Sequence, residues 1–312
     1  MKKIALTATL ALVLTACSPA SDDSDHVSVM SSIYPAQFLA ESIGGDLVEV
    51  TPITAPGADP HETELTPRRT AELLESDVVL WFSGIQPALD STLAESKRDE
   101  AVTIDLASPS NEDETDHDHD DDDHDHDHDE VDHDDHGHSH DGTDPHSWLN
   151  PGTMEDNVAH VRDALIAAAP EHKAAFTENA EKLHAELAQL HEDFEAGLSN
   201  CKQRTFVTGH AAFGHLAEEF DLEQVAALSG DSHDEPSAAE LARIATLMKN
   251  NNITTVFSQS TEADATAKTL ARETGATIAV LNPLEFAPTA PADYVSVMRD
   301  NLAALTTAMA CQ

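Results

Sequence analysis

Short apolar runs alternate with amphipathic segments along the first half of the chain. Runs of strand length, rich in apolar residues, predict strands over 27–33, 47–53, 78–82 and 102–106. Apolar residues at helical spacing predict helices over 36–43 and 67–76, the second of which begins at a proline. Strands that alternate with helices predict an α/β lobe, which we place at 26–170.

The same alternation returns in the second half of the chain. Strands are predicted over 204–208, 224–228, 254–257 and 277–281. Helices are predicted over 211–220, 236–249, 262–273 and 291–309. This half therefore predicts a second α/β lobe, which we place at 200–312.

One long amphipathic helix is predicted between the two lobes, over 171–199. Its apolar stripe, at spacings of three and four, consists of Phe176, Ala180, Leu183, Leu187, Leu190, Phe194 and Leu198. At a rise of ~1.5 Å per residue, a helix of this length extends roughly 40 Å, enough to connect two lobes. His184 and His191 lie off the stripe, so we expect them to be solvated.

The balance of charged residues narrows the range of partners. Of the 312 residues, 16 are Lys or Arg and 59 are Asp or Glu, which gives a formal net charge of -43. Because so few cations cannot neutralise a phosphate backbone, we exclude nucleic acid as a partner. A strongly acidic chain suits cationic ligands instead.

Much of this charge is concentrated in one His/Asp-rich segment. Residues 111–140 contain 16 acidic residues, nine of the 19 histidines, and no Lys or Arg. Such a segment cannot bury enough apolar surface to order itself, so we predict a disordered loop over 111–143. Its histidines are His117, His119, His124, His126, His128, His133, His136, His138 and His140.

The first residues have the pattern of a secretory signal. Two lysines precede an apolar run over 4–14 that is too short to span a bilayer as a helix. Cys17 follows Leu-Thr-Ala, which resembles the bacterial lipobox, so we predict a signal peptide over 1–16, lipidation of Cys17 and a polar tether over 17–25. The alternative is an ordinary cleavable signal with an incidental cysteine. The mature protein is then expected to be soluble, extracytoplasmic and lipid-anchored to a bacterial membrane, in the periplasm or on the cell surface.

The two remaining cysteines predict a disulfide. Cys201 and Cys311 are left once Cys17 carries lipid, and two thiols outside the cytoplasm usually pair. The alternative is two separate buried thiols. Metal binding by this pair is disfavoured because neither cysteine has a neighbour at CxxC spacing.

Three histidines outside the His/Asp-rich segment lie where strands or loops are predicted to end. His61 and His146 each follow an Asp-Pro pair, and His210 comes directly after a predicted strand. Ligands collect beyond the carboxyl ends of strands in α/β sheets, and a proline lowers the entropic cost of ordering its loop. Since neutral imidazole is the commonest zinc ligand, these side chains predict a metal site. Taken singly, each is as well explained as an ordinary loop or cap residue.

Residues 26–312 resemble the solute-binding proteins of zinc and manganese ABC importers, the ZnuA-like family. The motifs that carry the resemblance are Gly57-Ala58-Asp59-Pro60-His61, Asp144-Pro145-His146-Ser147-Trp148-Leu149, Gly209-His210-Ala211-Ala212-Phe213-Gly214 and Asn282-Pro283-Leu284. The resemblance implies two Rossmann-like α/β lobes joined by a long backbone helix, with the metal in the cleft between them. It also implies a monomeric receptor that captures Zn²⁺ and delivers it to an ABC permease and ATPase complex.

The resemblance implies His61 and His146 as metal ligands from the first lobe and His210 from the second. A histidine in the third position favours zinc, because manganese prefers oxygen ligands. The fourth position falls on Asn282, where many relatives carry Asp, and an amide oxygen is a weaker donor to zinc than a carboxylate. The alternatives for this position are a water molecule, Glu285, Glu62 or a histidine of the loop.

Two other functions are compatible with three histidines. A hydrolase would use an open fourth position for water, but the sequence contains no HExxH motif to supply a general base. A surface adhesin or zinc buffer would need no permease. For the His/Asp-rich loop, we expect low-affinity capture of several ions near the cleft or a report of zinc sufficiency, and the alternative is a solvated loop that serves solubility.

Overall fold

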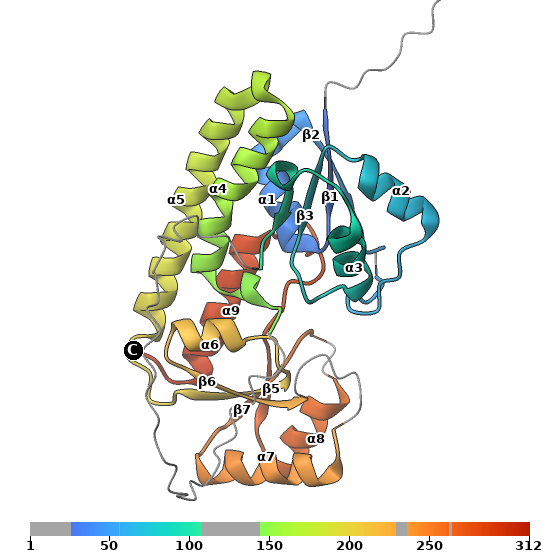
Figure 1. The fold of residues 1–312 in the computed structure, drawn as a ribbon. Coiled ribbons are helices and arrows are strands. Elements are labelled where there is room, and N and C mark those ends of the chain that lie inside the picture. Colours follow the sequence, from blue (N-terminus) through green and yellow to red (C-terminus); the bar gives the residue numbers. More distant parts are fainter. Residues whose placement is uncertain (1–25, 56, 108–143, 229–235, 262–263) are drawn as a thin grey trace, which may run out of the picture.

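The structure, a computed structural model, describes residues 26–55, 57–107, 144–228, 236–261 and 264–312. In it the chain forms two α/β lobes, with a pair of long helices along one side of the molecule (Figure 1). The predicted fold class is therefore confirmed. The signal peptide over 1–16, the tether over 17–25 and the loop over 111–143 lie outside the described residues.

The N-terminal lobe contains a four-stranded parallel sheet with the strand order β2-β1-β3-β4. Its strands are β1 (Val27–Ser31), β2 (Val48–Pro52), β3 (Val78–Trp81) and β4 (Thr103–Asp105). The helices are α1 (Tyr34–Gly44), α2 (Pro67–Glu75) and α3 (Pro87–Glu95), with short 3₁₀ helices at Gly45–Leu47 and Glu100–Val102. Leu73 of α2 and Leu89 of α3 pack with Val79 on one face of the sheet, whereas α1 packs on the other.

The C-terminal lobe repeats this plan with the strand order β6-β5-β7-β8, all parallel. Its strands are β5 (Thr205–His210), β6 (Glu223–Leu228), β7 (Thr255–Ser258) and β8 (Thr277–Val280). Its helices are α6 (Gly214–Glu219), α7 (Ala238–Asn250), α8 (Ala265–Thr274) and α9 (Tyr294–Ala308). Each of the last three begins at a side-chain cap that accepts a backbone N–H, from Ser237, Asp264 and Asp293.

Two long helices pack against each other and connect the lobes. They are α4 (Pro151–Ala168), which follows a 3₁₀ turn at Ser147–Leu149, and α5 (Lys173–Leu198). Each of the seven stripe residues predicted for the connecting helix is buried in α5. Figure 1 shows α5 running along both lobes, so its buried stripe ties the two α/β units together.

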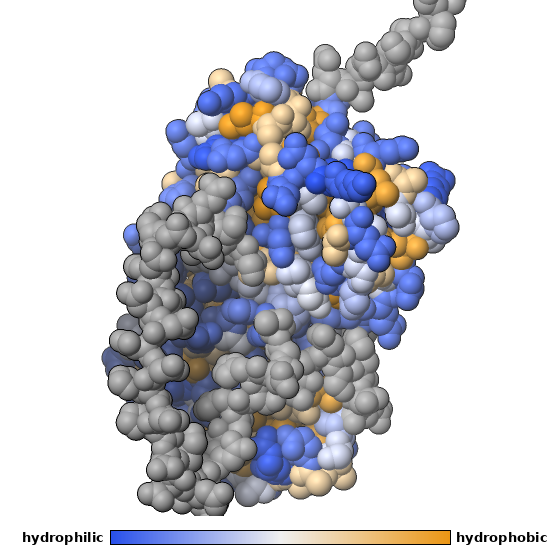
Figure 2. Space-filling model, viewed as in Figure 1, coloured by the Kyte–Doolittle hydropathy of each residue, from blue (hydrophilic) through white to orange (hydrophobic). Residues whose placement is uncertain are grey.

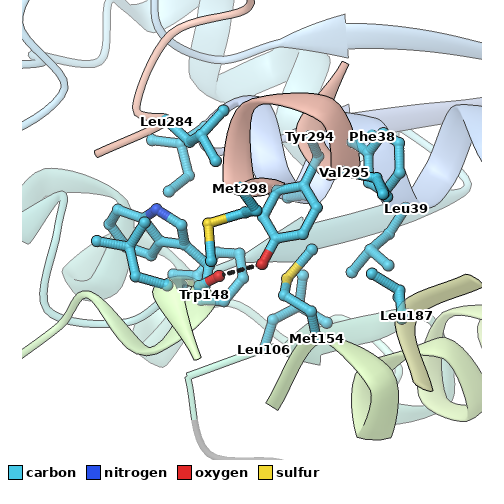
Figure 3. Packing of buried hydrophobic residues seen from close by; sticks show 14 of the residues in the cluster. Phe38, Leu39, Leu106, Trp148, Met154, Leu187, Leu284, Tyr294, Val295 and Met298 are labelled. Atoms are coloured by element: carbon cyan, nitrogen blue, oxygen red, sulfur yellow. Dashed lines mark hydrogen bonds between the residues drawn. The ribbon is translucent and has the colours of Figure 1, made fainter. Parts of the chain in front are cut away.

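The contact between the lobes has an apolar core with two buried polar links (Figure 3). Trp148 is fully buried, and its indole N–H donates to the carbonyl oxygen of Pro283 at 2.7 Å. The hydroxyl of Tyr294, at the start of α9, donates to the carbonyl oxygen of Trp148 at 2.6 Å. The ring of Tyr294 also stacks on Phe38 of α1, with centroids 5.3 Å apart. These contacts position the loop before α4 against the loop after β8.

The predicted disulfide is present. Cys201 and Cys311 are bonded, and they lie just beyond the ends of α5 and α9. Backbone hydrogen bonds flank the bridge, from Gln203 to Met309 and from Gln312 to Asn200. The bridge thus fastens the last helix of the chain to the end of the connecting helix.

Three details of the predicted elements differ from the structure. The connecting helix was expected over 171–199, but α5 has 26 residues because Pro170–His172 forms a separate 3₁₀ turn. Helices α3 and α4 were not predicted. His191, expected to be solvated, is only 25% exposed and lies 3.2 Å from Glu219, whereas His184 is 56% exposed.

The surface is largely polar on the face drawn in Figure 2, with smaller apolar areas between the polar ones. The exposed large apolar side chains among the described residues are Leu74, Ile278 and Phe286. None of the helices in the described ranges has the length and apolar character needed to cross a membrane.

Candidate metal centre

Four side chains that commonly bind metals converge between the lobes. His61, His146, His210 and Glu285 each offer one ligand atom, and these four atoms all lie within 4.8 Å of one another. The three histidines singled out from the sequence are therefore brought together. Glu285, one of the alternatives for the fourth position, completes the group.

The convergence follows from the topology of the two sheets. His61 lies in the loop after β2, and His146 lies just before the 3₁₀ turn that leads to α4. His210 is the last residue of β5, and Glu285 follows β8. Each residue comes after the carboxyl end of a parallel strand, which is where α/β sheets collect ligands.

The spacing of the donor atoms suits a small divalent cation. The Nε2 atoms of His146 and His210 are 3.4 Å apart, and Oε1 of Glu285 lies 3.8 Å from Nε2 of both His61 and His146. Tetrahedral zinc ligands about 2.0–2.1 Å from the ion lie roughly 3.4 Å from one another. A zinc ion thus requires only small adjustments of these side chains.

The site is shielded from solvent. The side chains of His61, His146 and Glu285 are 8%, 1% and 9% exposed. Burial together with the facing imidazole of His146 lowers the pKa of His210. Burial opposes ionisation of Glu285, but the neighbouring His61 and His146 outweigh it and lower the pKa of this carboxyl. Neutral imidazole and ionised carboxylate are the forms that bind metals, so both shifts favour coordination.

Polar contacts fix the backbone around each histidine. The backbone N–H of His61 donates to Oδ1 of Asp59 at 2.9 Å, which tightens the Asp-Pro-His turn. The carbonyl oxygen of His210 accepts from the hydroxyl of Thr208 at 2.7 Å and from the amide of Gln224 at 3.0 Å. Asp144 contacts both the backbone N–H and the ring of His146. The sequence contained a signal for this last role, an Asp two residues before a candidate ligand, which had been interpreted only as part of a rigid loop.

Asn282 has a different set of contacts from Glu285. Its side-chain oxygen accepts from the backbone N–H of Leu284 at 2.8 Å, and its backbone N–H and carbonyl pair with the amide of Asn301. These bonds shape the turn that leads to Glu285, in which Leu284 has a φ of 58°. Metal binding by Asn282 stays a prediction. Glu62 is exposed, and the nine loop histidines lie outside the described residues.

A cleft of about 240 Å³ opens beside the histidines. Its lining residues are Asp59, His61, Gly209, His210, Leu228, Gln259, Asp264, Thr266 and Glu285. Both lobes contribute to this wall, and three of its residues are acidic. The cleft therefore offers a polar route for a cation between solvent and the buried donors.

Comparisons with known proteins agree with this architecture. The family model described as "Zinc-uptake complex component A periplasmic" (ZnuA) matches residues 29–308. The zinc-binding lipoprotein AdcA of Streptococcus pneumoniae is 33% identical over 320 residues, which cover 98% of this chain and 60% of AdcA. The high-affinity zinc uptake system protein ZnuA of Bacillus subtilis is 28% identical, with 94% of this chain and 93% of that protein covered.

A solved structure shares the fold. The Zn(II)-bound ZnuA-like domain of Streptococcus pneumoniae AdcA superimposes with a TM-score of 0.72 at 30% sequence identity, covering 91% of this chain and 99% of that domain. The chain spans about 60% of the length of the AdcA relatives that it matches. Because the family model covers nearly the whole described part of the chain, the protein belongs to the ZnuA family of zinc-uptake components.

Proposed function

We propose that the protein is an extracytoplasmic receptor that binds one Zn²⁺ between its lobes and delivers it to an ABC permease and its ATPase. The observation that carries this proposal is the convergence of three imidazoles and one carboxylate from four separate segments. The names of the AdcA and ZnuA relatives support the same cargo and the same role in uptake.

The proposed ligands are His61, His146, His210 and Glu285. Three nitrogen donors and one carboxylate oxygen suit zinc, which accepts a tetrahedral mixture of nitrogen and oxygen ligands. Manganese and magnesium favour sites richer in oxygen. In this proposal Asn282 serves the turn before Glu285, through its bond to the Leu284 N–H, and is not a ligand.

A receptor fits the donor set better than a hydrolase does. A catalytic zinc site keeps one position open for water, whereas a structural or storage site fills all four with protein donors. Four converging protein donors leave no position for water on a tetrahedral ion. We therefore propose binding and release of zinc as the activity of this site.

The proposed attachment and domain boundaries follow the sequence. A signal peptide over 1–16 and lipidation of Cys17 place the protein on the outer side of a bacterial membrane, within reach of a permease. The tether over 17–25 leads to a first lobe over 26–170, and 171–199 connects it to a second lobe over 200–312. The protein acts as a monomer, since each chain contains a complete ligand set.

Zinc titration of variants with the loop removed tests the proposal. Deletion of 112–140 removes the nine loop histidines, so the remaining stoichiometry reports the cleft alone. We expect one high-affinity ion per chain, and its anomalous signal at the zinc edge should lie among the four proposed ligands. His61→Ala, a substitution in a loop, should weaken binding without changing the circular dichroism spectrum. Equal affinities for the parent and His61→Ala proteins would contradict the proposal.

A further inference from the structure

Asp144 lies where a ligand-bearing loop of the first lobe contacts the second lobe. Its Oδ1 atom is 2.8 Å from Nδ1 of His146 and accepts the backbone N–H of the same residue at 3.0 Å. Its backbone carbonyl oxygen is 2.7 Å from Nε2 of His215, in α6 of the second lobe. One residue thus contacts a metal-facing imidazole and the opposite lobe at once.

The carboxylate determines which nitrogen of His146 faces the cleft. A proton on Nδ1 is donated to Asp144, which leaves the Nε2 lone pair directed at His210 and Glu285. Burial opposes ionisation of Asp144, but its bond to His146 outweighs burial and lowers the pKa of this carboxyl. A carboxylate behind a ligating imidazole fixes its tautomer and orientation.

The second lobe shapes the space around Asp144. A Cβ atom on Gly214, the first residue of α6, would overlap Oδ2 of Asp144, so only glycine leaves room for the carboxylate in this position. The next residue, His215, supplies the donor to the Asp144 carbonyl. Two adjacent residues of α6 therefore contact opposite ends of Asp144.

We propose that Gly214 and His215 position Asp144, and through it the zinc-facing ring of His146, so that a first-lobe ligand is correctly oriented only while the lobes are in contact. Separation of the lobes breaks the bond between His215 and the Asp144 carbonyl and loosens the His146 ring. Release of zinc is thereby coupled to opening of the cleft. This inference rests on the zinc-receptor function proposed above, since it assigns positioning residues to the same site.

A matched pair of substitutions at His215 tests the coupling. His215→Phe keeps a ring but removes the donor, whereas the amide nitrogen of His215→Gln has nearly the reach of Nε2 and can restore it. The measurement is the zinc dissociation rate constant, from competition with an excess of a chromogenic chelator. The loss of one hydrogen bond should raise this rate constant about 2- to 12-fold in His215→Phe. His215→Gln should return it to nearly the wild-type value.

Two further readouts separate positioning from a general loss of stability. The visible spectrum of bound Co²⁺ reports ligand geometry, and it should change in His215→Phe but not in His215→Gln. In the metal-free protein, nitrogen chemical shifts of His146 should report mainly the Nδ1–H tautomer in the wild type and a mixture of tautomers in His215→Phe. Asp144→Asn, which is nearly isosteric, should weaken zinc binding about 10-fold, at the low end of the range for such partners.

The outcomes distinguish this inference from the function on which it rests. If wild-type protein binds zinc in the cleft but His215→Phe matches it in dissociation rate, Co²⁺ spectrum and tautomer, the coupling is refuted and the receptor function stands. If His61→Ala and wild type bind zinc equally, the receptor function itself fails. A His215→Phe protein that does not fold leaves His215→Gln and Asp144→Asn to decide, and wild-type behaviour of Asp144→Asn would refute the positioning role.

Discussion

Glu285 and Asn282 lie three residues apart, but only Glu285 offers a free type of donor to the cleft. The carboxylate of Glu285 is 9% exposed and 3.8 Å from two of the imidazoles. The amide oxygen of Asn282 accepts the N–H of Leu284. The first side chain is placed to bind an ion, and the second is placed to hold the turn that presents it.

Substitution of Glu285 should therefore affect zinc far more than substitution of Asn282. Glu285→Gln replaces an anionic donor with a neutral one, and we expect the dissociation constant for zinc to rise at least about tenfold, or ~1.4 kcal/mol. Asn282→Ser is the matched control, since a serine hydroxyl can accept the same turn hydrogen bond. Calorimetric titration should give less than a tenfold change for this variant. A larger loss for Asn282→Ser than for Glu285→Gln would make Asn282 the fourth ligand.

Acid should destabilise the metal-free protein through His210. Its folded pKa lies below the ordinary value, so between that lowered pKa and about 6.5 the unfolded chain binds a proton that the native state does not. Stability then rises with pH across this window and falls as the pH drops below about 6.5. Glu285 acts in the same direction at lower pH, because its contribution is lost as the pH falls through its lowered pKa.

Urea unfolding of the metal-free protein at several pH values between 5 and 7.5 measures this effect. His210→Gln removes the titrating group, so this variant should lose part of the decline in unfolding free energy between pH 7.5 and 5. An identical pH dependence in wild type and His210→Gln would show that other groups govern the acid sensitivity.

The residues of the site were predictable to different degrees. His61 and His146 stand in repeated Asp-Pro-His motifs and His210 ends a strand, so their chemistry is visible in the sequence. Glu285 carries no motif of its own, and its position depends on how the loop after β8 packs against Trp148 through the Pro283 carbonyl. Contacts between segments 135 residues apart cannot be deduced from local spacing.

Helix α4 shows a different limit of the sequence analysis. Its buried Met154, Val158, Val161 and Leu165 do recur at helical spacing, and Asn150 caps its first turn through the N–H of Gly152. This helix was therefore predictable from its pattern, although it was not predicted. Its role was not predictable, because the antiparallel pairing with α5 depends on tertiary packing of the two apolar stripes.

The disulfide should stabilise the fold without affecting the site. The bridge joins residues 110 positions apart, at the ends of α5 and α9, and both lie outside the ligand set. The double substitution Cys201→Ser with Cys311→Ser should lower the unfolding free energy by about 2–5 kcal/mol, since it releases a long loop in the unfolded chain. The flanking backbone hydrogen bonds of Gln203 and Gln312 should keep the helix ends in place.

Urea unfolding and zinc titration of this double variant test both parts of the prediction. The dissociation constant for zinc should stay within a factor of about two of the wild-type value, a difference below ~0.5 kcal/mol. A marked loss of zinc affinity would mean that the bridge also positions the second lobe against the first.

Because the proposed ligands come from both lobes, zinc should stabilise the protein as one unit, and the His/Asp-rich loop should not be needed for it. An ion that binds only the native state at 1,000 times its dissociation constant adds about 4.1 kcal/mol to the unfolding free energy. Differential scanning calorimetry should therefore show a single transition that moves to higher temperature with zinc. Deletion of 112–140 should lower the total zinc stoichiometry, because nine histidines are lost, but should leave this shift in place. His146→Ala should do the reverse, since it keeps the loop and removes a cleft donor. If the deletion abolished the shift while His146→Ala preserved it, the stabilising ion would belong to the loop, and the cleft would not be the principal zinc site.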